Sequence, residues 1–434
     1  MTAIVGILNK KAAVVAADTA LTVTRGNSTR SIYYNNTKIF KLSDKYPAAV
    51  MTFSNADFMG VPLGVLINMY KDQEGDKGFK DLQGYVDNFI QFLDKERNLH
   101  DPNCQRDYLR SEILTLYGKV KDYVTEQIQS EVDARPDYEY TDEESASIIR
   151  KYFAEGLEMV ETYVKGNNKC SRFDRYDFQR FQNYSREEID GLMECFREDD
   201  IPEDMRDDFE KVLYDYLCSE FFYNGSGLVF VGYGKEDLYP SLLPIYVSGI
   251  IDDHFRYSYA EEDNVYINND NSSTISPFAQ TDVMMTVMKG VSPMFYQKFD
   301  ELHQSAIDQT KQKMVEAMRA AGISEKTIAK VQEVNTDDII EKREEEVLDF
   351  IRKEYTDGLV DTVETFNIED MANMAESLIE ITNLQRHITS SEESVGGPVD
   401  VAVITRDRGF VWMKHHDWAP SGIDVDFRKS SRID

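Results

Sequence analysis

Three residues near the start of the chain have side chains that together can activate a nucleophile. Thr2 offers a hydroxyl, Asp18 a carboxylate and Lys38 an ammonium group. A threonine hydroxyl is a weak nucleophile until a base takes its proton, and an N-terminal α-amine, with an unperturbed pKa of about 8, can be that base. The chemistry therefore requires that Thr2 becomes residue one. We expect removal of Met1, because threonine is small enough to permit it.

Lys38 and Asp18 have complementary roles in such a unit. Lys38, held close to the amine of Thr2, disfavours a second positive charge and keeps that amine neutral. Asp18 neutralises and orients Lys38. Taken singly, Asp18 is a turn cap and Lys38 an ordinary strand-edge cation. Taken together, the three residues favour a catalytic triad.

Short apolar segments are expected to position these side chains. Residues 2–8, TAIVGIL, predict a strand, NKK a tight turn, and residues 12–17, AAVVAA, a second buried strand that delivers Asp18 at its end. An antiparallel hairpin of this length brings the end of its second strand back beside Thr2. Further expected elements are a polar loop over 19–37, strands at 38–42, 48–54 and 227–234, and two strands around a polar turn in 399–412.

The start of the chain resembles the opening of a proteasome-type N-terminal nucleophile hydrolase, a family that includes the proteasome β subunits. In that family a threonine exposed as residue one is the nucleophile, an acid follows sixteen residues on, and a lysine begins the third strand. Thr2, Asp18 and Lys38 match these positions, with a longer loop before the lysine. The resemblance covers roughly the first hundred residues and the strands and helices after about residue 225.

The resemblance implies an α+β fold, a four-layer αββα sandwich of two antiparallel sheets flanked by helices. The expected hydrolase domain is discontinuous and comprises residues 1–129, 223–289 and 360–434. Apolar residues at helical spacing predict two insertions into it. One is an acidic helical subdomain at 130–222, and the other is a helical hairpin at 290–359.

The resemblance also implies residues that support the nucleophile. A backbone N–H in the turn of Phe53 and Ser54 would bind the oxyanion of the tetrahedral intermediate. Thr281 stands where the family has a turn that supports the amine, although it is equally a helix-entry residue. Glu392 falls nearest the family's second acid, and Ser394 is the available hydroxyl before a double glycine. The alternative is that this last turn is purely structural.

The partners of the chain are expected from the same resemblance. Thr19 and Thr22 would line an edge against which a peptide substrate adds as an extended strand. The family commonly assembles into rings with the active sites facing an enclosed chamber, so we expect a homo-oligomer. An unfoldase or adaptor partner is not identified by the sequence.

The composition limits what the chain binds. At 434 residues, 41% hydrophobic and 12% aromatic, it has enough apolar side chains for a proper core. The formal net charge of -31 argues against nucleic-acid or anionic-membrane binding, because phosphates would be repelled. No secretory signal or membrane span is expected, since the apolar run after Met1 is short and is interrupted by Lys10 and Lys11. We therefore expect a cytoplasmic protein.

Neither the cysteines nor the histidines have the spacing of a metal site. The cysteines are widely scattered and lack the close pairs of zinc or thioredoxin-like chemistry, so we expect reduced, partly buried thiols. The histidines show no metal spacing either. The sequence predicts no bound metal and no cofactor. The residues concerned are Cys104, Cys170, Cys195, Cys218, His100, His254, His303, His387, His415 and His416.

Three functional hypotheses follow. The first is a threonine hydrolase that cleaves peptide or amide bonds through an acyl-enzyme intermediate. The second is a catalytically silent member of the family that serves as an assembly or binding module, which the altered oxyanion turn favours. The third is a small-molecule amidase, which shares the mechanism and differs in the shape of its pocket.

Overall fold

The structure is a computed structural model that describes residues 2–25, 29–33, 36–136, 138–193, 201–389 and 396–416. Helices and antiparallel sheets both contribute to it, so the fold is α+β.

The chain divides into two compact units, each of which is discontinuous in sequence. The first unit comprises residues 1–39, 238–241 and 266–434. The second unit comprises residues 40–237 and 242–265. The segment that begins with Thr2 and ends with Lys38 therefore belongs to the first unit.

The first unit contains an antiparallel sheet with the strand order β13-β1-β2-β14-β15. The predicted N-terminal hairpin is confirmed as β1 and β2, and the two strands predicted in 399–412 are confirmed as β14 and β15. The edge strand β13 pairs with β1 along the whole length of both strands. The strands are β1 (Ala3–Asn9), β2 (Ala13–Asp18), β13 (Ser273–Ala279), β14 (Val399–Thr405) and β15 (Gly409–Lys414).

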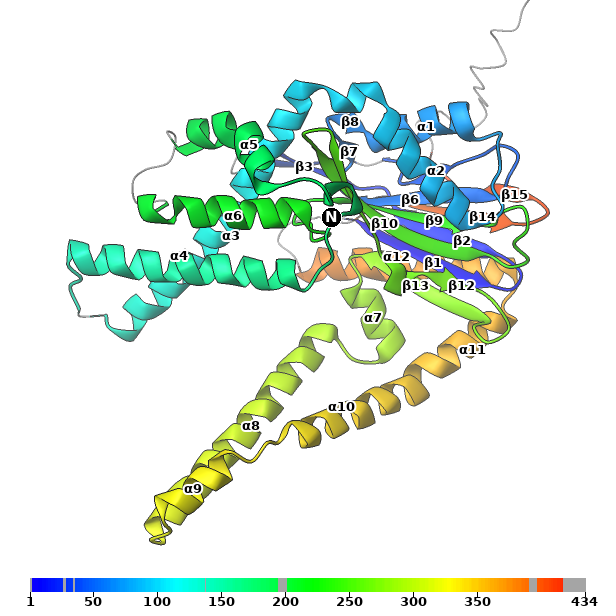
Figure 1. Ribbon diagram of the computed structural model, residues 1–434. Helices are drawn as coiled ribbons and strands as arrows, with labels where there is room; N and C mark the ends of the chain where they lie inside the picture. The colour runs from blue at the N-terminus through cyan, green and yellow to red at the C-terminus, as the bar shows by residue number, and fades with distance from the viewer. Residues whose placement is uncertain are drawn as a thin grey trace, which may run out of the picture. The chain divides into compact units, whose positions relative to one another are not determined.

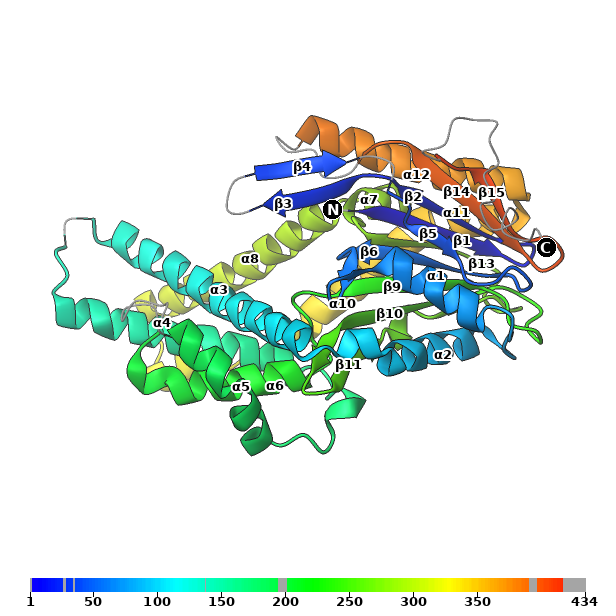
Figure 2. The ribbon, with the colours of Figure 1, turned by 90° about the horizontal axis from the view of Figure 1, so that it is seen from above.

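Helices pack on one face of this sheet, as Figure 2 shows for α12. Alternate residues of the strands, such as Val5, Val14 and Val401, form a core with Met371 and Leu378 of α12. Successive side chains of a strand point to opposite faces, so these alternate residues lie on the face that the helices cover, although every residue of β1, β2 and β14 is buried. The helices are α7 (Asp282–Lys289), α11 (Asp357–Thr365) and α12 (Ile368–Thr389).

The polar loop predicted over residues 19–37 is wrong in part. Leu21–Arg25 forms strand β3 and Thr29–Tyr33 forms strand β4, and the two pair as an antiparallel ribbon. Both segments are rich in threonine, β-branched and aromatic residues, which favour extended backbone even beside polar neighbours.

A helical arm occupies the place of the hairpin expected at 290–359. It contains two long helices with a short helix between them, and Gly322, at φ +76°, follows the first of these. Figure 1 shows α8, α9 and α10 extending away from the sheet of the first unit. The elements are α8 (Pro293–Ala320), α9 (Glu325–Gln332), α10 (Asp337–Ile351) and the π-helical segment η5 (Arg352–Thr356).

The second unit is built around an antiparallel sheet with the strand order β11-β10-β9-β6-β5. The strands predicted at 48–54 and 227–234 are confirmed as β6 and β9. A Cβ at Gly227 would lie 2.0 Å from the ring of Phe53, so any other residue there would require that ring to move. The strands are β5 (Ile39–Lys41), β6 (Ala48–Ser54), β9 (Ser226–Gly232), β10 (Ser241–Ile251), β11 (His254–Tyr259) and the short β7 (Asp57–Phe58), β8 (Val61–Pro62) and β12 (Val265–Tyr266).

Two helices, α1 (Leu63–Glu74) and α2 (Leu82–Lys95), form one core with this sheet. Asp81 caps α2 by accepting a hydrogen bond from the N–H of Gly84 at 3.0 Å. Buried residues such as Phe89 recur along α2 at helical spacing, so the helix presents one apolar face to the sheet.

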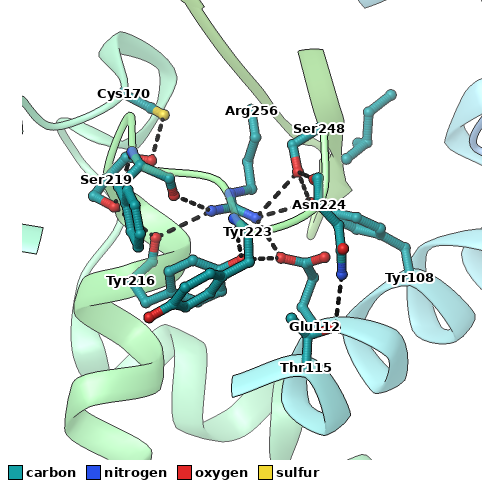
Figure 3. Close-up of polar contacts among 12 residues, drawn as sticks. Tyr108, Glu112, Thr115, Cys170, Tyr216, Ser219, Tyr223, Asn224, Ser248 and Arg256 are labelled. Carbon is teal, nitrogen blue, oxygen red and sulfur yellow. Dashed lines mark hydrogen bonds and ion pairs between the residues drawn. The ribbon is translucent and has the colours of Figure 1, made fainter. Parts of the chain in front are cut away.

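A helical subdomain follows α2 in the second unit. In the part that the structure describes, its helices are α3 (Pro102–Ala134), α4 (Asp142–Lys165), α5 (Phe178–Met193) and α6 (Arg206–Cys218). The short 3-10 turns of this unit are η1 (Arg97–His100), η2 (Ser171–Phe173), η3 (Glu203–Met205) and, after β11, η4 (Glu261–Asp263). Arg256 of β11 is fully buried and joins the sheet to this subdomain (Figure 3). Across the described residues, no helix has the length and apolar composition needed to cross a membrane.

Candidate active site

Thr2 lies directly before β1, at the end of the hairpin where β2 finishes. The register of the hairpin pairs Ile4 with Ala17, so the start of β1 lies beside the end of β2. The carbonyl of Thr2 accepts a hydrogen bond from the backbone N–H of Gln280 at 3.1 Å. This bond holds residue 2 against the end of β13.

Asp18 joins Lys38 to the backbone of the first strand. Its Oδ1 accepts a hydrogen bond from the N–H of Ala3 at 2.8 Å and another from Nζ of Lys38 at 2.7 Å. Its Oδ2 accepts from the N–H groups of Ala20 and Gly396, each at 3.3 Å. Four donors therefore fix one fully buried carboxylate, and they place the ammonium of Lys38 beside the Thr2–Ala3 peptide.

Lys38 is an unusual lysine because only 4% of it is exposed. Burial lowers the pKa of its ammonium group, since an apolar environment disfavours the charged form. The carboxylates of Asp18 and Asp400 act against this shift but do not cancel it. Lys38 therefore loses its proton more readily than a surface lysine does, which suits a group that moves or controls a proton.

Asp400 is a buried acid near the candidate site that was not predicted from the sequence. It lies on β14 opposite Ala17 of β2, and it is 1% exposed. Burial by itself would raise the pKa of Asp400, but the nearby imidazole of His415 and a hydrogen bond from the backbone N–H of His416 lower it overall. The available signal was a lone acid in the apolar strand VDVAVIT, since an isolated charge inside a buried strand needs a partner.

Of the predicted support residues in the first unit, the structure describes Thr281 but not Glu392 or Ser394. Thr281 is the N-cap of α7 and makes no side-chain capping bond, while its N–H donates to the carbonyl of Ala279 at 3.1 Å. Ala279 itself has φ +64° and pairs with Ala3, so this turn lies next to Thr2. Glu392 and Ser394 lie outside the described residues.

The predicted substrate edge begins with a residue whose polar groups already have partners. The hydroxyl of Thr19 donates to the carbonyl of Pro398 at 2.9 Å, and its carbonyl accepts from the N–H of Asn36 at 3.0 Å. Thr22 pairs with Ile32 in the β3–β4 ribbon. The role of both residues in substrate binding stays a prediction.

Phe53 and Ser54, the predicted oxyanion residues, end strand β6 of the second unit. The ring of Phe53 packs edge-on against Tyr246, with the centroids 5.9 Å apart. Ser54 has φ +68°, the left-handed conformation that usually requires glycine. The backbone here therefore adopts a glycine-like turn although the residue is serine.

Replacing Ser54 tests this conformation. Ser54→Gly is expected to leave stability unchanged or raise it by up to about 1 kcal/mol, because relief of the positive φ offsets the backbone entropy of glycine. The matched control is Thr52→Gly in the extended part of β6, which is expected to cost at least about 1 kcal/mol. Urea unfolding of both variants makes the comparison. Equal losses in the two variants would show that φ at Ser54 carries no strain.

The described residues offer few sites for other chemistry. Among them, no group of three or more His, Cys, Asp or Glu residues has the arrangement to hold a metal ion. Cys170 and Cys218 are buried, and burial raises the pKa of their thiols to about 11 and about 12, respectively. Both thiols are therefore protonated at neutral pH and are poor nucleophiles.

Comparison of the sequence with protein-family models and with curated proteins finds no match. The assignment of a class to this site therefore depends on its residues and on their geometry.

Proposed function

We propose that the chain is an N-terminal threonine hydrolase of the proteasome type, which cleaves peptide or amide bonds. The observation that carries the proposal is the sharing of Asp18 Oδ1 between the N–H of Ala3 and Nζ of Lys38, at 2.8 and 2.7 Å. The end of a strand does not require a buried lysine with a lowered pKa next to residue 2. Such a lysine does suit the activation of an N-terminal threonine.

The proposed reaction begins when Oγ of Thr2 attacks the substrate carbonyl carbon. The α-amine of the same residue accepts the hydroxyl proton and then passes it to the leaving amine as the C–N bond breaks. The product is an acyl ester on Thr2. Water then adds to this ester, the amine again accepts and returns a proton, and the acid product leaves with Thr2 restored.

Lys38 and Asp18 act on this reaction through their charges. The ammonium of Lys38 lowers the pKa of a nearby amine by like-charge repulsion, so the amine is neutral and able to accept a proton. Asp18 is itself fixed by hydrogen bonds from three backbone N–H groups and holds Lys38 in place through one more, so that little reorganisation accompanies the transfer.

The proposal includes the architecture and assembly of the family. The two antiparallel sheets would form the inner layers of a four-layer αββα sandwich, and the helices would form the outer layers. A backbone N–H near Ser54 would then bind the oxyanion, and several copies of the chain would assemble into a ring that admits extended peptide substrates.

One observation favours a second candidate, the catalytically silent assembly or binding module. Thr2 is only 8% exposed in the chain that still carries Met1. A buried nucleophile reaches substrate only if processing opens its surroundings. A small-molecule amidase uses the same residues, and a panel of amide substrates of increasing size separates it from a peptidase.

The experiment that tests the proposal is intact-protein mass spectrometry with a peptide epoxyketone, an electrophile that reacts with both the hydroxyl and the free amine of an N-terminal threonine. We expect loss of Met1 and a single adduct that maps to Thr2. A chain that retains Met1, or that loses it and stays unmodified, would contradict the proposal and favour the binding module.

A further inference from the structure

The helical arm of the first unit (Figure 1), residues 293–356, carries an exposed apolar stripe on α8. Phe295, Phe299 and Leu302 follow one another at helical spacing, and they are 63%, 46% and 59% exposed. The rings of Phe295 and Phe299 stack with their centroids 6.4 Å apart, so the stripe is a continuous surface. Contiguous exposed apolar surfaces usually mark interaction sites.

The arm does not cover this stripe itself. Among its described side chains, the buried hydrophobic ones are Val315, Ile328 and Ile351, whereas eleven large hydrophobic side chains are exposed. α8 and α10 are joined by the ion pair of Arg343 with Asp300. Helical spacing puts Asp300 on a different face of α8 from the stripe, so this contact with α10 leaves the stripe uncovered.

Positive and negative charges are concentrated in different parts of the arm. Residues 311–330, around its tip, contain five lysines or arginines and two glutamates. Residues 341–349 of α10 contain five acidic residues and two basic ones. Since Arg343 pairs with Asp300, these acids lie at the level of the apolar stripe on α8. The arm therefore has an acidic half, formed by residues 341–349 and the stripe, and a basic half, formed by residues 311–330.

The acidic half has a surface hollow that suits an apolar side chain beside an ammonium group. Leu348 is exposed there among acidic side chains. The basic half carries the complement, because Met314 is 54% exposed and directly follows Lys313. The hollow has a volume of about 560 Å³ and is lined by Glu345, Glu346, Leu348, Asp349 and Arg352.

We propose that two copies of the chain associate through their arms, side by side and antiparallel about a two-fold axis. The basic half of each arm then lies against the acidic half of the other, with Met314 of each copy over apolar side chains of the second copy. A parallel arrangement would instead place like charges together. The two-fold axis makes the two contacts identical, so each complementary surface is used twice.

A second copy is the partner that the charges favour. A different partner would need a basic and an acidic surface at the same separation as those of the arm, whereas a second copy necessarily has this separation. The formal net charge of -31 makes two copies repel each other in general, which confines attraction to the place where opposite charges face each other. The arm lies in a helical insertion outside the expected hydrolase domain, so this inference does not rest on the proposed function.

The first test is the mass of the full chain in solution, measured by sedimentation velocity over a range of concentrations. We expect a reversible dimer. Phe295→Ser with Phe299→Ser removes most of the apolar stripe and should raise the dissociation constant at least about tenfold, because aromatic side chains usually carry much of the energy of an interface. Leu238→Ser is the matched control, since Leu238 is 68% exposed but lies outside the arm, and it should leave the constant unchanged.

Charge reversal tests the antiparallel orientation. A tip variant, Lys313→Glu with Lys326→Glu, and an α10 variant, Glu345→Lys with Glu346→Lys, each place like charges across the interface. Each variant alone should be monomeric at concentrations where the natural chain is dimeric. All four side chains are exposed, so the fold should be unaffected. In an equimolar mixture the two variants should associate, because every reversed surface again faces its opposite, and such rescue requires contacts between chains.

Three outcomes would overturn the inference. A natural chain that stays monomeric at every concentration lacks this interface, and cross-links within that monomer would show another part of the chain covering α8. An oligomer that none of the variants changes is held together elsewhere, as a ring of hydrolase domains would be. Charge variants that gain nothing on mixing exclude the antiparallel pairing. None of these outcomes bears on labelling at Thr2, so the proposed function stands or fails separately.

Discussion

Thr2→Ala is expected to abolish turnover and epoxyketone labelling while the fold stays intact. The variant retains an N-terminal amine after loss of Met1, but it lacks the oxygen that forms the acyl ester. Removal of a nucleophile typically costs at least about 10³-fold in rate. The stability cost should be about 1 kcal/mol, the usual size for a single substitution, which leaves the chain folded. Amide hydrolysis and urea unfolding measure the two effects.

Thr2→Ser is the matched control. Serine keeps the hydroxyl and the amine on one residue, so labelling at residue 2 should persist. Activity that survives in Thr2→Ala would contradict the proposal, since no other hydroxyl is assigned the role. Loss of activity in both variants, with folding intact, would indicate that the methyl group of Thr2 positions the nucleophile.

Breaking the buried ion pair of the second unit is expected to have the largest effect on stability. Nη1 of Arg256 donates to Oε2 of Glu112 at 3.1 Å, and both side chains are shielded from solvent. The hydroxyls of Tyr108 and Tyr216 complete the cluster in Figure 3, with Tyr216 donating to the same Glu112 oxygen at 2.5 Å. Glu112→Leu leaves a buried charge without its partner, which typically costs about 3–5 kcal/mol.

The double variant Glu112→Leu with Arg256→Met provides the test of this reasoning. It leaves neither charge uncompensated, so its loss of stability should be smaller than that of either single variant. Lys165→Met, which breaks an exposed pair with Glu161, should barely differ from the natural chain. Urea unfolding followed by circular dichroism compares all four. Additive losses in the double variant would mean that the two charges do not interact.

The local pattern of the sequence was sufficient for the N-terminal hairpin. Alternating and continuous apolar residues around NKK predicted β1 and β2, and the length of the hairpin predicted that Asp18 returns toward Thr2. The same kind of pattern predicted the last two strands, β14 and β15. The pattern failed over residues 19–37, where polar residues concealed β3 and β4, because the threonines and aromatic residues there favour extended backbone.

The sequence predicted only those residues of the candidate site that lie near one another in the chain and whose types suggest catalysis. Thr2, Asp18 and Lys38 were named from their residue types and from the resemblance to a family's pattern, and the structure bonds Lys38 to Asp18. The N–H of Gly396 and the carboxylate of Asp400 reach the same region from nearly 400 residues away. No periodicity reports such a contact, because it depends on which strand becomes the neighbour of β2.

The sequence by itself therefore determined the hairpin, the residue types of the candidate site and the acidity of the chain. These depend on local backbone preferences and on composition, which each short segment carries within itself. The tertiary structure decided the burial of Lys38 and of Asp400, and the pairing of Arg256 with Glu112. Burial changes the energy of a charge, and burial exists only once distant segments have packed together.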